Sequence, residues 1–400
     1  MSSTRRQFLR VALTGAAGLP FAGKTLASDL LPSRPDFAVS DLALLDELER
    51  AAFEFFWNEA NPQTGLVMDR ANASGGGPQR LASVAATGFG LTALCIGHER
   101  EYRSRIGIEQ RVAKTLRFLA RDIPTEHGFF YHFVGEDSGK RSVSSEVSPI
   151  DMAILLCGAL TCREHFHGAQ IHRDATTIYD RVEWPWALDR GNTFALDWTP
   201  EYGFSPLRWD AYCESMMLYL LAMGSTTHPI SPECWRAFRR PKMVYGNHQF
   251  ISSPAPLFVH QFSHAWFDFR NKRDDYANYF ENSVIASRAH REFCAGLSER
   301  FPCYSGDVWG ITASDSSAGY VAWGGPPMQG PIDGSIVPAA SAGSLPFLFP
   351  ESMAVLRNLR SYYGKPIWKK YGFVDAFNPL TGWVSKNVLG IDVGISMLMA

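Results

Sequence analysis

The chain has 400 residues, with 38 lysines and arginines against 40 aspartates and glutamates, and a formal net charge of −2. A near-neutral chain with no run of basic residues beyond its first ten positions lacks the electrostatic footprint of a nucleic-acid-binding protein. The sequence also contains no stretch of about 18 uncharged apolar residues, the length that a membrane-spanning helix needs. Its 13% aromatic residues, with 11 tryptophans, fit bulky core packing and also the flat rings that line sugar-binding clefts.

The first thirty residues have the layout of an export signal. Arg5 and Arg6 precede a short apolar stretch, 11–22, and small residues follow as far as Ala27. This order is typical of a twin-arginine signal peptide, so we expect the mature chain to reach the periplasm or the medium through the twin-arginine export machinery, with no stable membrane anchor. The predicted segments are a signal peptide over 1–27, a linker over 28–40 and a single domain over 41–400.

Two kinds of helix alternate along the mature chain, which contains few convincing strands. Amphipathic helices carry apolar residues at intervals of three and four, whereas the others are apolar nearly all round. One-sided patterns predict helices over 42–60, 109–119, 172–182 and 231–238, and continuous apolar patterns predict helices over 81–98, 149–162 and 210–224. Further helices are predicted over 259–269, 276–297, 350–363 and from 391 onward.

The alternation predicts the fold class. Helices that are apolar all round must be covered on every side, whereas amphipathic helices face water with half of their surface. An inner and an outer ring of helices satisfies both, so the sequence predicts an all-α fold, an (α/α)6 barrel. A helical solenoid is the alternative, but the sequence shows no fixed repeat period.

Acids lie at the starts of the apolar helices. Ser148, Pro149 and Asp151 fit the cap, first and third positions of a helix, which explains Asp151 structurally. Glu146 lies before the cap, where capping requires no acid, and it is therefore a candidate site residue. Asp210 could cap the next apolar helix. Glu214 lies one turn further on, and burial there would make its carboxyl group costly to ionise. The resulting raised pKa is the property that a general acid needs.

Two later acids and several histidines complete the candidates. Asp375 and Asp392 could each be a helix cap or a site residue. Of the histidines at 127, 132, 260 and 264, the last two are four residues apart, but no HExxH motif accompanies them, so we predict no metal site. The seven cysteines contain no CxxC pair, which predicts buried thiols rather than disulfides or metal ligands. No GxSxG motif indicates a serine hydrolase.

Several segments of the chain resemble the bacterial glucoamylase-like domain, a group that includes the β-1,2-glucan-cleaving enzymes of glycoside hydrolase family 144. The resemblance runs in order from about residue 43 to 400. It is carried by 85–91, 127–133, 145–151, 208–214, 260–266, 309–315 and 320–324.

This resemblance implies a six-hairpin glycosidase-like (α/α)6 barrel that hydrolyses a β-glucan with inversion at the anomeric carbon and without a cofactor. The acids that match the family's activity-linked acids are Glu146 and Glu214. A third family acid would fall on Val143, and its absence leaves the linkage specificity open.

On this basis we assign roles to the candidates. Glu214 is the expected general acid, Glu146 is its partner or a sugar-positioning acid, and Asp375 or Asp392 is a reserve base. Sugar stacking is expected on Trp209, Trp266, Trp309 and Trp323. Hydroxyl groups of an oligo- or polysaccharide substrate are expected to contact Arg208, His132, His264, Asp151, Asp210 and Asp315. The alternatives are a carbohydrate-binding protein without cleavage, a transglycosylase on the same barrel, and a helical scaffold.

Overall fold

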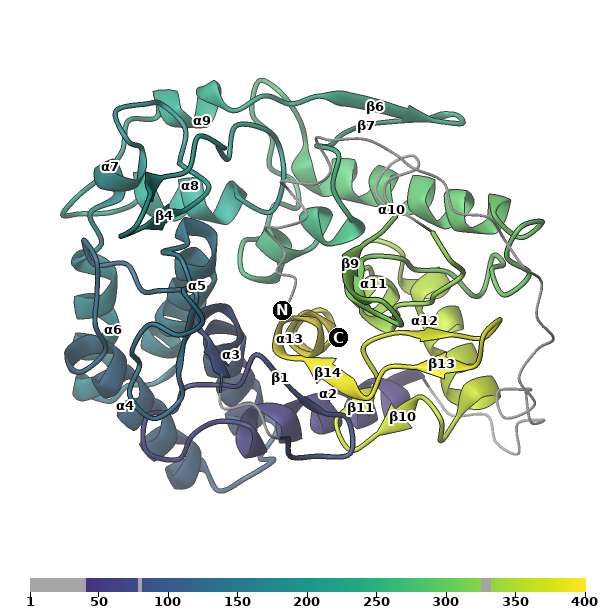
Figure 1. The fold of residues 1–400 in the computed structure, drawn as a ribbon, viewed down its shortest axis with the longest axis horizontal. Helices are drawn as coiled ribbons and strands as arrows, with labels where there is room; N and C mark the ends of the chain where they lie inside the picture. Colours follow the sequence, from purple (N-terminus) through teal and green to yellow (C-terminus); the bar gives the residue numbers. More distant parts are fainter. Residues whose placement is uncertain (1–40, 78–80, 325–331) are drawn as a thin grey trace.

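A computed structural model describes residues 41–77, 81–324 and 332–400, so the predicted signal peptide and linker lie outside the described residues. Helices build the molecule (Figure 1). The helices predicted as one-sided, together with two later ones, are α2 (Asp41–Asn58), α4 (Arg105–Arg121), α6 (Ala169–Asp180), α9 (Glu233–Ala237), α10 (Tyr279–Gly296) and α12 (Phe349–Asn358), the last continued by the π-helical η4 (Leu359–Tyr363). The more completely buried helices are α3 (Val84–Glu99), α5 (Pro149–His165), α8 (Met216–Met223), α11 (Pro338–Ala342) and α13 (Gly390–Met399). The all-α prediction is thus confirmed at the level of helical architecture.

The difference between the two kinds of helix follows from their residues. In α3 and α5 the residues are buried on all sides except near the C-terminal ends, because neither helix has a continuous polar face. Ser83 and Ser148 cap these two helices through their side chains, as the sequence predicts for Ser148. In α4, by contrast, burial is confined to the stripe formed by Ile108, Val112, Thr115, Leu116 and Leu119.

Glycines let α3 and α5 pack closely. A Cβ atom added to Gly158 would lie 2.1 Å from the carbonyl oxygen of Gly88, and one added to Gly88 would lie 2.4 Å from the carbonyl oxygen of Ile154. Neither position has room for a side chain. The two backbones therefore touch, which fixes the spacing of these two helices.

The ends of the described chain meet. Helix α13 contacts both α2 and α3, and it also contacts α11 (Figure 1). Helix α3 contacts α5, and α5 contacts α8. Among the described residues, no helix is both long and apolar enough to cross a lipid bilayer.

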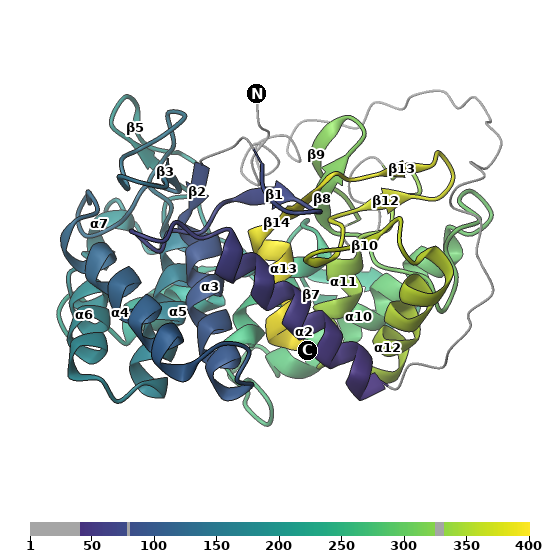
Figure 2. The same ribbon diagram turned by 90° about the horizontal axis from the view of Figure 1, so that it is seen from below.

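The strands are short and form antiparallel pairs in the connections. The pairs are β1 (Arg70–Asn72) with β14 (Asn387–Leu389), β2 (Leu81–Ser83) with β3 (Phe133–Gly135), β4 (Trp198–Thr199) with β5 (Gly203–Phe204), β6 (Lys242–Tyr245) with β7 (His248–Ile251), β8 (Ala313–Ser316) with β9 (Gly319–Ala322), β10 (Trp368–Lys369) with β11 (Gly372–Phe373) and β12 (Phe377–Asn378) with β13 (Trp383–Val384). Figure 2 shows many of them gathered at one end of the helices, where α5 begins.

Three predictions about elements need correction. The helix predicted over 210–224 begins only at Met216. The helix predicted over 259–269 is instead two 3-10 turns, η2 (Leu257–His260) and η3 (Phe262–Ala265), so His260 and His264 do not share one α-helical face. The short helices α7 (Trp184–Ala187) and α11 were not predicted.

Candidate active site

A cavity of about 360 Å³ lies where α5 and α8 begin. Its wall is largely apolar and includes Ile150, Leu207 and Phe258. Six residues predicted for the site also line it, namely His132, Asp151, Arg208, Trp209, Asp210 and Glu214. The fold thus brings two segments that are far apart in sequence, 132–151 and 208–214, to one cavity.

Glu214 is held at the cavity by its backbone. It lies just before α8 and is only 4% exposed. The Ser263 hydroxyl donates to the Glu214 carbonyl at 2.7 Å and accepts from the Met217 N–H at 3.1 Å, so η3 fixes the chain on both sides of the helix start. Burial and the Glu214 carboxylate raise the pKa of the adjacent Cys213 thiol well above its usual value, which keeps that thiol neutral.

An imidazole lies between two carboxylates on the same wall. His132 Nδ1 is 3.0 Å from Glu146 Oε1 and 3.7 Å from Asp151 Oδ2. Asp151 accepts a hydrogen bond from the Ser148 hydroxyl, and its own N–H donates to that hydroxyl at 3.3 Å. The His132 ring also stacks on Phe133 at a centroid distance of 3.8 Å. These contacts fix the orientation of the Asp151 and His132 side chains.

Glu146 occupies a different place from the one expected. It contacts His132 but is not among the side chains that line the cavity. Its backbone carbonyl accepts from the His132 N–H at 2.8 Å, so the two residues are joined by both main chain and side chain. Among the described residues, the carboxylates that reach the cavity wall are therefore those of Asp151, Asp210 and Glu214.

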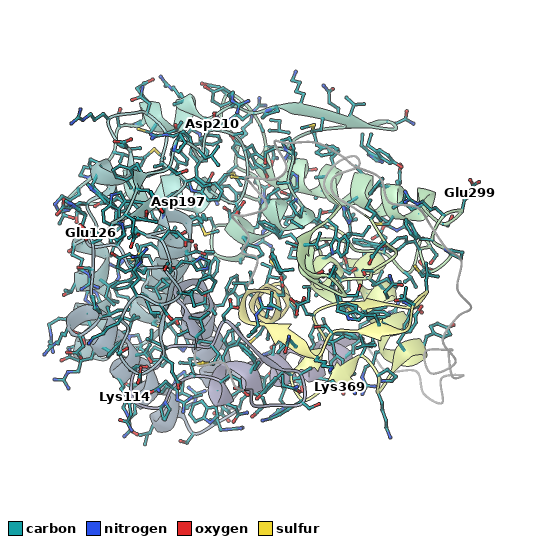
Figure 3. The ribbon with its side chains drawn as sticks, viewed as in Figure 1. Lys114, Glu126, Asp197, Asp210, Glu299 and Lys369 are labelled. Atoms are coloured by element: carbon teal, nitrogen blue, oxygen red, sulfur yellow. The ribbon has the colours of Figure 1, made fainter. Side chains whose placement is uncertain are left out.

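Two charged residues form the rim of the cavity. Both carboxylate oxygens of Asp210 lie 3.1 Å from Nη2 of Arg239, and the two side chains are 45% and 66% exposed. Because they reach solvent, the cavity is accessible from outside. Figure 3 shows Asp210 near α9, on the same side of the molecule as Asp197. Asp210 does not cap α8, and Arg239 is a lining residue that sequence analysis missed.

Arg208 and Trp209 line the cavity, but most of the surface of each side chain contacts other parts of the protein. The Arg208 guanidinium donates to the carbonyl of Leu188 at 2.5 Å and also to the carbonyl of Thr193. It therefore anchors this loop rather than offering all its donors to a ligand. Trp209 is 4% exposed, so only a small part of its ring faces the cavity.

The other predicted contact residues lie elsewhere, and their proposed roles are corrected here. Trp309 is fully buried, and Trp323 is buried with its indole N–H donating to Ser314 at 3.0 Å. Trp266 is half-buried and donates to Thr92 at 2.9 Å. His264 is half-buried beside Ser283, with its Nε2 3.0 Å from the hydroxyl, and desolvation of the ring lowers its pKa to about 3. None of these four lines the cavity within the described chain.

Asp315, Asp375 and Asp392 form a separate acidic cluster. The Asp315 N–H donates to Asp375 Oδ2 at 2.6 Å, and Asp392 lies in the first turn of α13. Arg70, which sequence analysis missed, contacts Asp315 Oδ1 at 2.9 Å and Asp69 Oδ2 at 3.0 Å. A separate void of about 20 Å³ is lined by Asp375 and Asp392. The cluster is not part of the 360 Å³ cavity.

Burial decides the protonation state of Asp375. Its pKa is raised well above the usual value, first by burial and then by the neighbouring charges of Asp392 and Asp315. A carboxyl group that keeps its proton cannot accept one from water. Asp375 therefore does not fit the role of reserve base in this structure.

Comparisons with known proteins agree with the resemblance found in the sequence. Residues 206–400 match a family model described as "Putative glucoamylase". The chain is 28% identical over 402 aligned positions to the exo-β-1,2-glucooligosaccharide sophorohydrolase (non-reducing end) of Parabacteroides distasonis, covering 90% of this chain and 54% of that protein. The chain thus spans about half the length of this curated relative.

Solved structures share the fold. An endo-β-1,2-glucanase from Chitinophaga pinensis, in complex with sophorotriose and glucose, superposes with a TM-score of 0.84 at 27% identity, covering 90% of this chain and 92% of that one. A β-1,2-glucanase from Parabacteroides distasonis has a TM-score of 0.83 at 26% identity, covering 91% of this chain and 57% of that one. The predicted similarity to glucoamylase-like proteins is confirmed.

Proposed function

We propose that this chain is a glycoside hydrolase that cleaves a β-1,2-linked glucan or gluco-oligosaccharide. The observation that carries the proposal is the cavity in which Glu214 and Asp151 share one largely apolar wall. Similarity over the whole described domain to proteins that act on β-1,2-glucan supports the substrate class. Hydrolysis of a glycosidic bond needs two carboxyl groups, and this cavity provides them.

The proposed mechanism is inverting. Glu214, buried before α8, donates a proton to the leaving oxygen. Asp151 activates the attacking water, because it lies in the first turn of α5, where the helix dipole favours a negative charge. Glu146 orients His132, which presents a ring N–H to a substrate hydroxyl. This assignment keeps the predicted acid. It gives Asp151 the role of base that was predicted for Glu146, or in reserve for Asp375 or Asp392.

The direct test uses purified wild-type protein and linear β-1,2-glucan. We expect new reducing ends, and NMR spectra taken early in the reaction should show the α-anomer first, since inversion of a β-linkage produces it. Absence of cleavage of β-1,2-glucan, alongside cleavage of another glucan, would refute the proposed linkage. Binding without any new reducing ends would select the carbohydrate-binding alternative, and longer or cyclic products would select a transglycosylase.

We also propose that the inner elements close an (α/α)6 barrel formed by one domain. The contacts of α3 with α5, α5 with α8, and α13 with both α11 and α3 supply most of the ring. The two 3-10 turns supply the remaining position. Ser263 bonds to the start of α8, and the Gln261 amide donates to the Ala340 carbonyl at 2.9 Å and to the Ser344 hydroxyl at 3.0 Å, beside α11.

The export route is a further part of the proposal. The adjacent Arg5 and Arg6 before an apolar stretch support export by the twin-arginine machinery to the periplasm or beyond. Replacing both arginines by lysine should retain the protein in the cytoplasm, as measured by cell fractionation. Continued export of the double variant would refute this route.

A further inference from the structure

A cluster of possible metal ligands lies at the opposite end of α5 from the cavity. His98 and Glu99 end α3, and His165 ends α5. One ligand atom from each lies within 4.8 Å of the other two. Asp151 is 14 residues from His165, which corresponds to about 21 Å along the helix. This cluster is therefore distinct from the candidate active site.

The distances suit one small cation. His165 Nε2 is 2.9 Å from His98 Nδ1, and Glu99 Oε1 is 3.6 Å from the former and 4.0 Å from the latter. Ligands bound to tetrahedral Zn²⁺ at about 2.0–2.1 Å lie about 3.4 Å from one another. The three observed distances bracket that value, so small rotations of the side chains would form the site.

The surroundings hold the two imidazoles in place. Phe166 packs edge-on against both rings, at 5.0 Å from His98 and 4.6 Å from His165. The helices that carry the histidines are fixed by the close contact of their glycines. The side chains of His98 and His165 are 16% and 19% exposed, and that of Glu99 is 65% exposed, so an ion and a water molecule can enter from solvent.

The chemistry of the three ligands indicates the ion. Two imidazoles and one carboxylate are ligands that Zn²⁺ accepts with a water in the fourth position. We propose that His98, Glu99 and His165 form a zinc site that joins the C-terminal ends of α3 and α5. The other titratable or charged groups that interact electrostatically with His165 are His167 and Arg105. The Nε atom of Arg105 lies 3.1 Å from Oε1 of Glu101, so this charge is paired.

A buried pair of thiols lies one turn away on the same two helices. Cys95 Sγ is 3.5 Å from Cys162 Sγ, and both residues are buried. Thiolates also bind zinc, so the test must distinguish the imidazole pair from the thiol pair. The thiols are outside the group of three whose ligand atoms converge.

The test uses the full chain without a histidine tag, treated with a chelator and dialysed. Titration calorimetry with ZnCl₂ should give one ion per chain, and saturating zinc should raise the melting temperature. His98→Ala and His165→Ala should abolish binding, and Glu99→Gln, at an exposed position, should weaken it about tenfold. His172→Ala, at an exposed histidine of α6, is the matched control and should bind like the wild type.

Cobalt identifies the ligands directly. Co²⁺ in place of zinc should give the visible bands of a four-coordinate site without a thiolate charge-transfer band. The proposal is overturned if the wild type binds no zinc, if binding survives in both histidine variants, or if the cobalt spectrum shows thiolate ligation.

Discussion

Val143 occupies a backbone conformation that β-branched residues rarely adopt. Its φ is +48° and that of Ser144 is +54°, and the Ser145 N–H donates to the Ser142 carbonyl at 2.9 Å, which defines a tight turn of the mirror-image type I class. The valine side chain is 70% exposed and packs little against the protein. The residue that replaces the expected family acid is therefore strained and contributes little to the core.

We expect Val143→Asn to stabilise the protein by about 1 kcal/mol, because asparagine tolerates a positive φ. Urea unfolding of the two proteins measures the change. Val143→Thr is the matched control, since threonine is polar but keeps the branched Cβ. Equal stabilisation by both variants would show that exposed apolar surface, and not backbone strain, is the cause.

Because the Asp375 carboxyl is buried, we expect its replacement to raise the stability of the protein by an amount that depends on pH. Its raised pKa means that the folded state holds a proton that the unfolded state releases above about pH 3.9, so this group lowers stability as pH rises through that range. Asp375→Asn keeps an acceptor for the Asp315 N–H and removes the group that lowers stability as pH rises, because an amide does not ionise. We expect the melting temperature of the variant to exceed that of the wild type at pH 7 and to approach it at pH 4. A gain that is the same at both values would contradict the raised pKa.

At the scale of the elements, the contact of α3 with α5 is the tightest constraint. Gly158→Ala would place a methyl group 2.1 Å from a backbone oxygen that cannot move without shifting α3. We expect a loss of about 3 kcal/mol in the free energy of unfolding, measured by urea denaturation. Gly296→Ala, at the exposed last residue of α10 with its nearest neighbour at 3.3 Å, should cost nothing. A tolerated Gly158→Ala would show that the two helices can separate.

The helices with a strong periodic pattern could be predicted from the sequence, and the irregular segments could not. The apolar period of α2 through α6 is local information, and the observed bounds lie within a few residues of the predicted ones. The segment 259–269 has a similar apolar pattern, but Gln261 and Ser263 form hydrogen bonds with α11 and α8 instead of facing solvent. These long-range contacts favour 3-10 turns, and no local signal reveals them.

The residues of the candidate site also divide into those that the sequence could predict and those that it could not. Glu214 could be selected from its position, because an acid one turn into a predicted apolar helix has few structural explanations. Asp151 and His132 could be predicted as substrate contacts only with the family resemblance, since capping alone explains an acid at Asp151. Arg239 and Arg70 could not be selected, because their partners Asp210 and Asp315 are distant in sequence. The roles of Trp309 and Trp323 could not be predicted, because a large ring serves a core and a sugar platform equally well, and only burial distinguishes the two.

For the whole molecule, three histidines that are fully or partly buried predict sensitivity to acid. Burial lowers the pKa of His260 and His264 to about 3 and that of His290 to about 4. Between these values and about 6.5 the unfolded chain binds protons that the folded chain does not, so stability falls as pH decreases, by about 1.4 kcal/mol per pH unit for each histidine. Urea unfolding at pH 7, 6 and 5 measures the slope.

The variant His290→Gln tests whether the histidines cause this dependence of stability on pH. His290 Nε2 accepts from the Ile311 N–H at 3.0 Å, and the glutamine oxygen of His290→Gln can take over as acceptor without titrating. We expect a shallower loss of stability below pH 6.5 in this variant. An unchanged slope would show that other groups cause the acid sensitivity.

In the proposed mechanism Glu214 protonates the leaving oxygen in the cavity where α5 and α8 begin. The most direct measurement is the turnover of a β-1,2-gluco-oligosaccharide by Glu214→Gln, compared with Glu299→Gln, a surface change far from Asp210 in Figure 3. We expect Glu214→Gln to lose at least about a hundredfold in kcat with an unchanged melting temperature, and Glu299→Gln to match the wild type. Turnover by Glu214→Gln near the wild-type rate would show that Glu214 is not the general acid.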